Sequence, residues 1–131
     1  MSQENVEAFH RIYEQWYGSR KLGRELLAED VEWVNPHDAL ERGSRRGIDS
    51  FNEAIKSVFD AWGEVRFEAE RVIERGDEVV ALGRVRGRGR AAGIEVARPH
   101  GQVWTFRDGR AIRMRWFHSH SETLEAAGLS E

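Results

Sequence analysis

One stretch near the end of the chain, residues 102–120, limits the fold most. It reads QVWTFRDGRAIRMRWFHSH. Asp108-Gly109 in its middle predicts a two-residue hairpin turn, because both central positions of such a turn need a positive φ. Around the turn, even-numbered positions carry aromatic, apolar, Gln and His side chains, while most odd-numbered positions are polar. Since successive strand residues point to opposite faces, we expect the even-numbered side chains to line a hollow.

The chain before this hairpin begins with helices. Apolar side chains at three- and four-residue spacing predict helices over residues 2–18 and 49–62, with a shorter one over 22–28. Ser50 and Glu53 fit a capping box at the start of the 49–62 helix. Residues 31–35 are predicted to form a short strand that ends at Pro36, and residues 37–47 a polar loop.

Period-two alternation begins at Val65. Val72-Ile73 is out of phase with the residues before it, so we expect a β-bulge near Arg71. A long strand is predicted over 79–90, with Arg84 on its inward face, and a helical tail over 122–127. The order of elements predicts an α+β fold in one domain, residues 1–131: a cone-shaped barrel whose strongly curved, mostly antiparallel sheet wraps around the N-terminal helices.

Composition narrows the classes of function. The net charge is −3 with both signs interspersed, which argues against nucleic-acid binding. The chain has no cysteine, which excludes a thiol nucleophile or a thiolate metal site. The N-terminus lacks an apolar signal-peptide core, and no apolar run approaches the ~20 residues of a membrane span. We therefore expect a cytoplasmic protein that binds neither nucleic acid nor membrane.

Several segments carry a resemblance to a known family. They are VEWVNP, GDEVVALGRVRGRGRAAG, VWTFRDGRAIRMRWF and ETLEAAGL. In this order and spacing, the sequence resembles the SnoaL-like group of the nuclear transport factor 2-like superfamily. The resemblance implies the cone-shaped fold, no cofactor, and a homodimer formed through the outer sheet face. Polyketide cyclases, isomerases, epoxide hydrolases, dehydratases and non-catalytic binding domains share this fold, so it does not define the reaction.

Two enzyme mechanisms of the superfamily do not transfer to this sequence. Where the ketosteroid isomerases carry two proton-transferring Asp residues, this chain has Asn35 and Gln102. The limonene epoxide hydrolases need an Asn and an Arg, which match Asn35 and Arg84. They also need two carboxylates, and those positions hold Arg86 and Trp116 here. The SnoaL-type cyclases use an acidic base, and no inward-facing carboxylate can be assigned from the sequence.

His118 is the strongest candidate for acid–base chemistry. It lies on the even-numbered face beyond Trp116, and an imidazole titrates near neutral pH. The alternative is a histidine at the mouth of the hollow that is satisfied by hydrogen bonds. His120, two residues further on, is expected to be solvated.

Asn35 and Arg84 complete the candidate catalytic set. Together with the amide of Gln102, they would orient or polarise a carbonyl oxygen. The alternative for the two amides is a structural hydrogen-bond network. For Arg84 the alternative is an ion pair with Glu68 or Glu70 on the neighbouring strand.

The walls of the hollow are predicted to be aromatic. Rings with polar groups around one hollow suit a flat, apolar ligand, although a packed core is the simpler interpretation. The candidate ligand-binding residues are Tyr13, Tyr17, Trp33, Gln102, Trp104, Met114 and Trp116.

Two further groups of residues are candidates, a pair of acidic residues and a set of histidines. Asp38 and Glu41 follow Pro36 and would supply a base if their loop folds over the hollow, although a solvated loop charge is the simpler interpretation. Metal binding is suggested by histidines but lacks a carboxylate partner at a convincing spacing, so no metal site is expected. The histidines are His37, His100, His118 and His120.

Two hypotheses of function follow. The first is a cofactor-free lyase, isomerase or cyclase that acts on a small, flat, mostly apolar, carbonyl-bearing molecule, with His118 as acid and base. The second is a non-catalytic module that binds a small ligand or a partner through the same cone.

Overall fold

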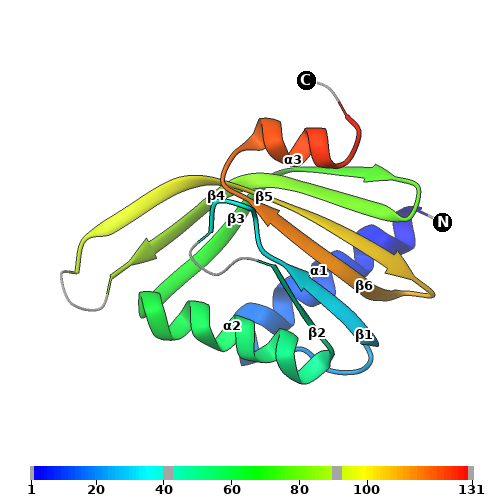
Figure 1. Ribbon diagram of the computed structural model, residues 1–131, viewed down its shortest axis with the longest axis horizontal. Helices are drawn as coiled ribbons and strands as arrows, with labels where there is room; N and C mark the ends of the chain where they lie inside the picture. The colour runs from blue at the N-terminus through cyan, green and yellow to red at the C-terminus, as the bar shows by residue number, and fades with distance from the viewer. Residues whose placement is uncertain (1, 40–42, 90–92, 130–131) are drawn as a thin grey trace.

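The computed structural model describes residues 2–39, 43–89 and 93–129. Within them, three helices pack on a curved, unclosed sheet of six strands (Figure 1). The helices are α1 (Ser2–Ser19), α2 (Ile48–Trp62) and α3 (His120–Ala126). The strands are β1 (Leu27–Val34), β2 (Ser44–Arg46), β3 (Glu64–Arg75), β4 (Glu78–Arg88), β5 (Glu95–Arg107) and β6 (Arg110–Phe117).

The strand order is β2-β1-β6-β5-β4-β3, and all neighbours are antiparallel except the parallel pair β1–β6. β3 to β6 form the predicted meander, and β1 joins it beside β6. The prediction of an α+β fold with a curved, mostly antiparallel sheet is confirmed. The sheet stays open, because its edge strands β2 and β3 do not pair with each other.

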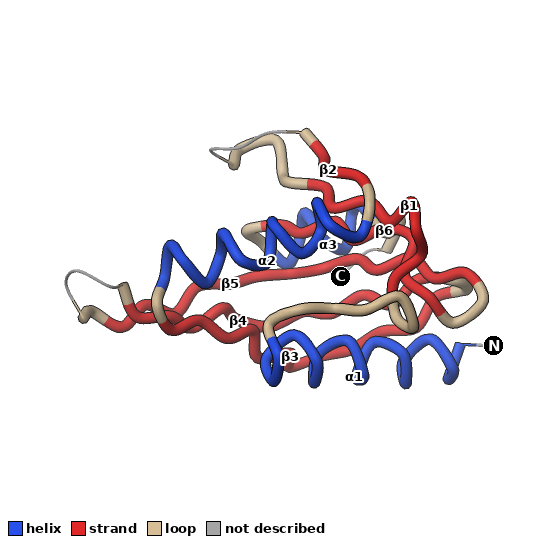
Figure 2. Tube along the Cα trace, turned by 90° about the horizontal axis from the view of Figure 1, so that it is seen from below, coloured by secondary structure: helices blue, strands red, loops and turns tan. Residues whose placement is uncertain are grey.

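Helices cover both faces of the sheet. The traces in Figures 1 and 2 show α1 and α2 on one side of it, and α3 across the other. The larger core joins α1 and α2 to the sheet through residues such as Phe9, Phe51 and Trp104. A smaller core places Leu124 of α3 against Val103. The hollow therefore lies on the side of α1 and α2.

The 49–62 helix forms as predicted, but its start differs. Gly47 is the N-cap, at a φ of 100°, and no side chain caps the helix, so the predicted capping box of Ser50 and Glu53 is wrong. Gly63 ends α2 at a φ of 79° and donates its N–H to the carbonyl of Phe59. Both ends rely on glycine because a left-handed φ is strained for other residues.

The predicted helix over 22–28 does not form. The chain makes a tight turn instead, in which the N–H groups of Leu26 and Leu27 both donate to the carbonyl of Gly23 at 3.1 Å. The N–H of Ala111 donates to the carbonyl of Leu26 at 2.8 Å, so pairing with β6 competes for this backbone and β1 begins at Leu27. The predicted 37–47 loop likewise contains β2, which pairs with β1.

Two β-bulges set which side chains face the hollow. The register of β3 and β4 shifts between Ala69 and Arg71, which confirms the bulge predicted there. Asp108 and Gly109 have φ values of 54° and 79°, as expected for the predicted turn. A second shift leaves Ile112 without a partner in the β5–β6 register. This unforeseen bulge brings the even-numbered positions of β5 and β6 onto one face.

The register of β4 against β5 reverses the prediction for β4. Val79 stands opposite Trp104, so the odd-numbered residues of β4 share a face with the even-numbered residues of β5. Val80 and Leu82 consequently lie on the outer face, under α3. Arg84 is exposed, with its Nε 3.9 Å from a carboxylate oxygen of Glu70. The expectation that Arg84 points into the hollow is therefore wrong.

Candidate functional site

A cavity of about 220 Å³ opens on the side of the sheet that carries α1 and α2. Gly87 of β4 helps to shape its wall, because a Cβ there would lie 2.7 Å from Cε3 of Trp62, which packs against the strand. The apolar wall residues include Trp16, Trp33, Val58, Trp62, Phe67, Val85, Met114 and Trp116. The polar ones are Tyr17, Arg98, His100, Gln102 and His118.

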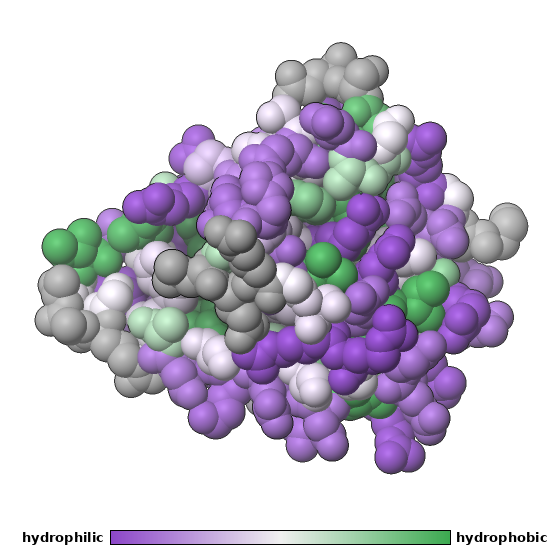
Figure 3. All heavy atoms as spheres, in the orientation of Figure 1, coloured by the Kyte–Doolittle hydropathy of each residue, from purple (hydrophilic) through white to green (hydrophobic). Residues whose placement is uncertain are grey.

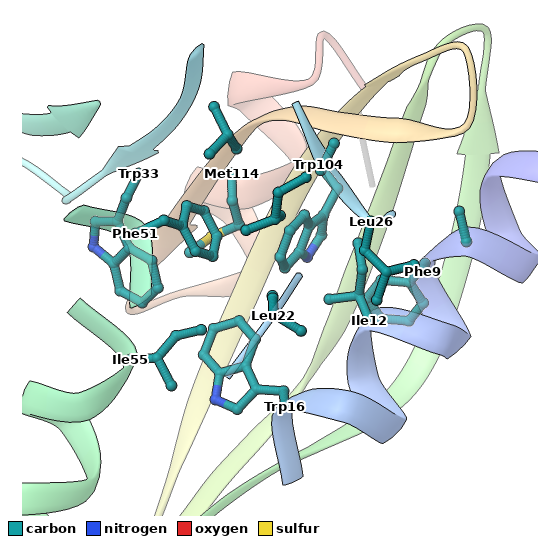
Figure 4. Close-up of a cluster of buried hydrophobic side chains, with 14 of the residues drawn as sticks. Phe9, Ile12, Trp16, Leu22, Leu26, Trp33, Phe51, Ile55, Trp104 and Met114 are labelled. Carbon is teal, nitrogen blue, oxygen red and sulfur yellow. The ribbon is translucent and has the colours of Figure 1, made fainter. Parts of the chain in front are cut away.

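A hydrogen-bond relay runs along β5 into this cavity. Nε1 of Trp104 donates to Oε1 of Gln102 at 2.8 Å, and Nε2 of Gln102 lies 3.1 Å from Nε2 of His100. Trp104 is 1% exposed and packs edge-on against Phe9 and Trp16 (Figure 4). Trp104 therefore lies in the core beneath the cavity and acts on it through Gln102.

His100 is held among aromatic rings. It stacks on Trp116 at a centroid distance of 5.6 Å and makes a T-shaped contact with Phe67 at 4.9 Å. Burial, with the neighbouring charges of His118 and His120, lowers the pKa of His100 to about 3. His100 is consequently neutral at pH 7.

Asn35 joins two tryptophans at one oxygen. Its Oδ1 accepts the indole N–H of Trp33 at 2.8 Å and that of Trp116 at 3.0 Å. The bond to Trp116 connects the end of β1 to β6, while both rings line the cavity. Because Oδ1 is engaged by these two donors, Asn35 orients the aromatic wall and is not itself among the described lining residues.

Histidines and carboxylates gather where β6 ends. Nε2 of His118 lies 3.8 Å from Oδ1 of Asp38, and both side chains are about half exposed. His118 also meets the ring of Trp116 edge-on at 5.0 Å. His120 is not fully solvated as expected, because its Nε2 lies 2.7 Å from the carbonyl oxygen of Gly83. His118 and Asp38 thus form a polar pair at the cavity mouth.

Tyr17 lines the cavity with a hydroxyl that is already engaged. The backbone N–H of Phe67 donates to this hydroxyl at 2.8 Å. Burial raises the pKa of Tyr17. Tyr17 therefore holds α1 to β3 and stays protonated at neutral pH, which makes it a fixed wall.

The predicted site residues separate into three groups. The structure brings Tyr17, Trp33, Gln102, Met114, Trp116 and His118 together on the cavity wall. Tyr13, Asn35 and Trp104 lie behind that wall among the packed rings. Arg84 lies outside, and Glu41 falls outside the described residues.

The sequence reasoning missed His100 and Arg98 as cavity residues. The signal for both was present, since strand alternation places them on the same face as Gln102. The sequence suggests His100 only as a metal ligand, and no group of three or more His, Asp or Glu side chains is placed to hold a metal among the residues that the structure describes.

The outer sheet face is partly covered by the chain's own α3. Arg115 of β6 donates to the carbonyl of Ala126, and its guanidinium lies 3.4 Å from a carboxylate oxygen of Glu78. Phe117 packs with the α3 cluster. A homodimer through the outer face stays a prediction. Its interface would have to lie on the part of the outer sheet face that α3 does not cover. Hydrophobic atoms visible in Figure 3 gather at the far end of the β4–β5 hairpin, where Ile94 is 64% exposed.

No helix in the described ranges, 2–39, 43–89 and 93–129, is long and apolar enough to cross a membrane.

Solved structures share this architecture. A protein of Jannaschia sp. CCS1 named as a SnoaL-like polyketide cyclase has a TM-score of 0.77 at 23% identity, over 88% of this chain and 85% of its own. An NTF2-like protein of Burkholderia pseudomallei K96243 has a TM-score of 0.77 at 25% identity, over 93% and 95%. TerC, co-crystallised with polyporic acid, has a TM-score of 0.76 at 27% identity, over 96% and 97%. These likenesses confirm the fold.

The family follows from the sequence match. No curated protein matches the chain significantly. The model of the SnoaL-like domain matches residues 6–114, which is most of the chain. This match covers α2 and most of α1, and it includes most of the strands that form the cavity. The chain therefore belongs to the SnoaL-like family, with the NTF2-like fold.

Proposed function

We propose that this protein is a cofactor-free lyase, isomerase or cyclase that moves a proton on a small, flat, carbonyl-bearing molecule. The observation that carries the proposal is the pair of His118 and Asp38 at the mouth of an aromatic cavity. A histidine beside a carboxylate is suited to accept and return a proton, because the carboxylate stabilises the protonated imidazole.

The wall of the cavity supports a flat, mostly apolar ligand. The rings of Trp33 and Trp116 are fixed by bonds to Asn35, and Trp16 packs 5.8 Å from Trp33. Such preset rings favour planar molecules, because little side-chain freedom is lost when the ligand enters. A volume of about 220 Å³ suits a small ligand.

The reaction would begin at the mouth. Nδ1 of His118 would take a proton from the carbon next to the carbonyl group, leaving an enolate, while Asp38, which faces Nε2, would stabilise the imidazolium. Return of the proton to another carbon is an isomerisation. Attack of the enolate carbon on a second carbonyl group, whose oxygen then takes the proton back from His118, is a cyclisation. No redox partner is needed in either case.

One relative supports the ligand class. TerC, at 27% identity over 96% of this chain, was co-crystallised with polyporic acid. The cavity of this chain, lined by tryptophans, makes an organic ligand the natural occupant. The similarity to TerC supports an organic ligand as a class and does not identify the molecule.

A binding module is the second candidate. The exposed side chains of His118 and Asp38 are 50% and 45% accessible, so water reaches them readily. A protein that only stores or senses a ligand would use the same aromatic cavity without proton transfer. The two candidates differ in whether a bound ketone exchanges its α-hydrogens.

Deuterium exchange tests the proposal. We expect the protein to accelerate exchange at the α-carbons of 2-tetralone in D₂O, followed by NMR. His118→Ala and Asp38→Asn should each lower that rate on the order of 10²-fold, the usual contribution of a positioned base. His10→Ala, a change at an exposed histidine of α1, is the control and should leave the rate unchanged. If the protein binds 2-tetralone but does not accelerate its deuterium exchange, the enzymatic proposal fails and the binding module is favoured.

A further inference from the structure

We infer that His100 is a hydrogen-bond donor fixed in one tautomer, and that with Arg98 it makes the cavity specific for carbonyl compounds that carry an anionic group. The inference rests on the proposed function only in taking the cavity as the ligand site. It does not require that any proton be transferred to or from the ligand.

The first step is the orientation of the Gln102 amide. An indole N–H is a donor only, so the group 2.8 Å from Nε1 of Trp104 must be the amide oxygen. The amide nitrogen of Gln102 is therefore the group that faces His100, and it is a donor only. Trp104, deep in the core, thus decides which end of Gln102 reaches the cavity.

The second step is the tautomer of His100. Its Nε2 lies 3.1 Å from the amide nitrogen of Gln102, which leaves Nε2 no role except that of acceptor. A neutral imidazole with an unprotonated Nε2 carries its proton on Nδ1. The relay from Trp104 therefore fixes His100 as the Nδ1–H form.

The third step is the access of that proton. No residue of the described part of the chain accepts a bond from Nδ1 of His100. Two side-chain atoms of the described residues are fully buried without a partner, the Nε atoms of Arg113 and Arg115. Nδ1 of His100 also has no partner but does not belong to this set, so it is not fully buried. Since His100 lines the cavity, Nδ1–H is a donor open to a ligand.

The fourth step is the second anchor. Arg98 lies two residues before His100 on the same face of β5 and also lines the cavity, at its exposed end. The three arginines of β4 pair with glutamates, but no carboxylate of the described residues pairs with Arg98. A guanidinium favours a carboxylate or an enolate, which it can bind through two parallel hydrogen bonds.

These features define a ligand with two polar ends. A neutral acceptor, such as a ketone oxygen, meets Nδ1–H of His100 inside the cavity. An anionic substituent meets Arg98 at the exposed end, about 7 Å away along the strand. The planar body between them lies against the ring of Trp116, which His100 also stacks on.

The tautomer is tested by NMR without any ligand. The two-bond ¹H–¹⁵N spectrum at pH 7 should show His100 protonated at Nδ1. Gln102→Glu replaces the donor to Nε2 by an acceptor and should move the proton to Nε2. Trp104→Phe removes the indole donor that orients the Gln102 amide, so it should give a mixture of the two His100 tautomers. An Nε2–H or charged His100 in the unmodified protein overturns the inference.

Matched ligands test the specificity. 2-Acetylnaphthalene should bind about fivefold more tightly than 2-ethylnaphthalene, which has the same shape and no acceptor. Gln102→Glu should abolish that difference. Arg98→Gln should weaken 2-naphthoate about tenfold and leave 2-acetylnaphthalene within twofold. Arg110→Gln, at the exposed hairpin turn, is the control.

The outcomes separate this inference from the proposed function. Equal affinity for the ketone and the hydrocarbon overturns it, as does failure of all three probes to bind, or an Arg98→Gln effect no larger than that of Arg110→Gln. If the predicted affinities are found and 2-tetralone does not exchange, the specificity stands and the enzymatic proposal fails.

Discussion

Trp116 donates its indole N–H to Oδ1 of Asn35, 3.0 Å away and 81 positions earlier in the chain. The same oxygen accepts the indole N–H of Trp33 at 2.8 Å. Asn35→Leu should leave two partly buried donors without an acceptor and lower the free energy of unfolding by about 2 kcal/mol or more. Urea titration followed by tryptophan fluorescence measures the loss.

Asn35→Asp is the matched change, because it keeps an oxygen at the position of Oδ1. It should cost less stability than Asn35→Leu and keep the emission maximum of the folded protein close to that of the unmodified one. Equal losses from the two changes would show that the shared oxygen contributes little.

Burial of His100 predicts sensitivity to acid. Its pKa is lowered from 6.5 to about 3 by desolvation, helped by His118 and His120. Between these values the unfolded state binds more protons at His100 than the folded state does. The contribution to stability is therefore complete above about pH 6.5 and is lost as the pH falls towards about 3. The urea concentration at the midpoint of unfolding should therefore fall steadily as the pH is lowered from about 6.5 towards about 3.

His100→Gln removes the titrating group and should flatten this part of the pH dependence. His10→Ala removes an exposed histidine and should leave the dependence as it is. A slope that is the same in the unmodified protein and in His100→Gln would assign acid sensitivity to other groups.

Because α3 covers the outer face, shortening a buried side chain of α3 should destabilise the protein. Leu124 is 4% exposed and packs in the cluster with Val80, Leu82 and Val103. Leu124→Ala should lower the free energy of unfolding by about 2–4 kcal/mol, from lost burial and the cavity left behind. Glu125→Ala, on the exposed side of α3, should change it by less than about 0.5 kcal/mol. Comparable losses would mean that α3 does not seal this face.

Local chemistry made several features predictable. Asp108-Gly109 forms the turn because these two residues tolerate the positive φ values it needs. The α2 helix follows from an apolar stripe that includes Phe51, Ile55 and Phe59. The family resemblance, carried by motifs spread over the chain, correctly indicated the fold.

Competition for backbone partners made other features unpredictable. Residues 22–28 have helical spacing, but the carbonyl of Leu26 is taken by Ala111 of β6. β2 has no apolar alternation of its own and exists because β1 offers an unpaired edge. In both places a strand distant in sequence supplies the deciding hydrogen bonds.

The site shows the same division. His118, Trp116, Gln102 and Trp33 line the cavity. Alternation along each strand is a local property that the sequence predicts, whereas the pairing that brings β1, β5 and β6 onto one face depends on the tertiary structure. His100 was undervalued because its importance lies in contacts with Gln102, Trp116 and Phe67 that no spacing reveals.

The sequence by itself determined the hairpin turn, the long helices and the alternation along each strand, since these depend on neighbouring residues. Only the tertiary structure decided which alternate set of each strand faces the cavity. The register of β4 against β5 puts Val79 opposite Trp104, and the bulge at Ile112 aligns Trp104 with Met114. A shift of one residue exchanges the two faces of a strand, and that shift is fixed by packing across the whole sheet. Arg84 lies outside and His100 inside for this reason.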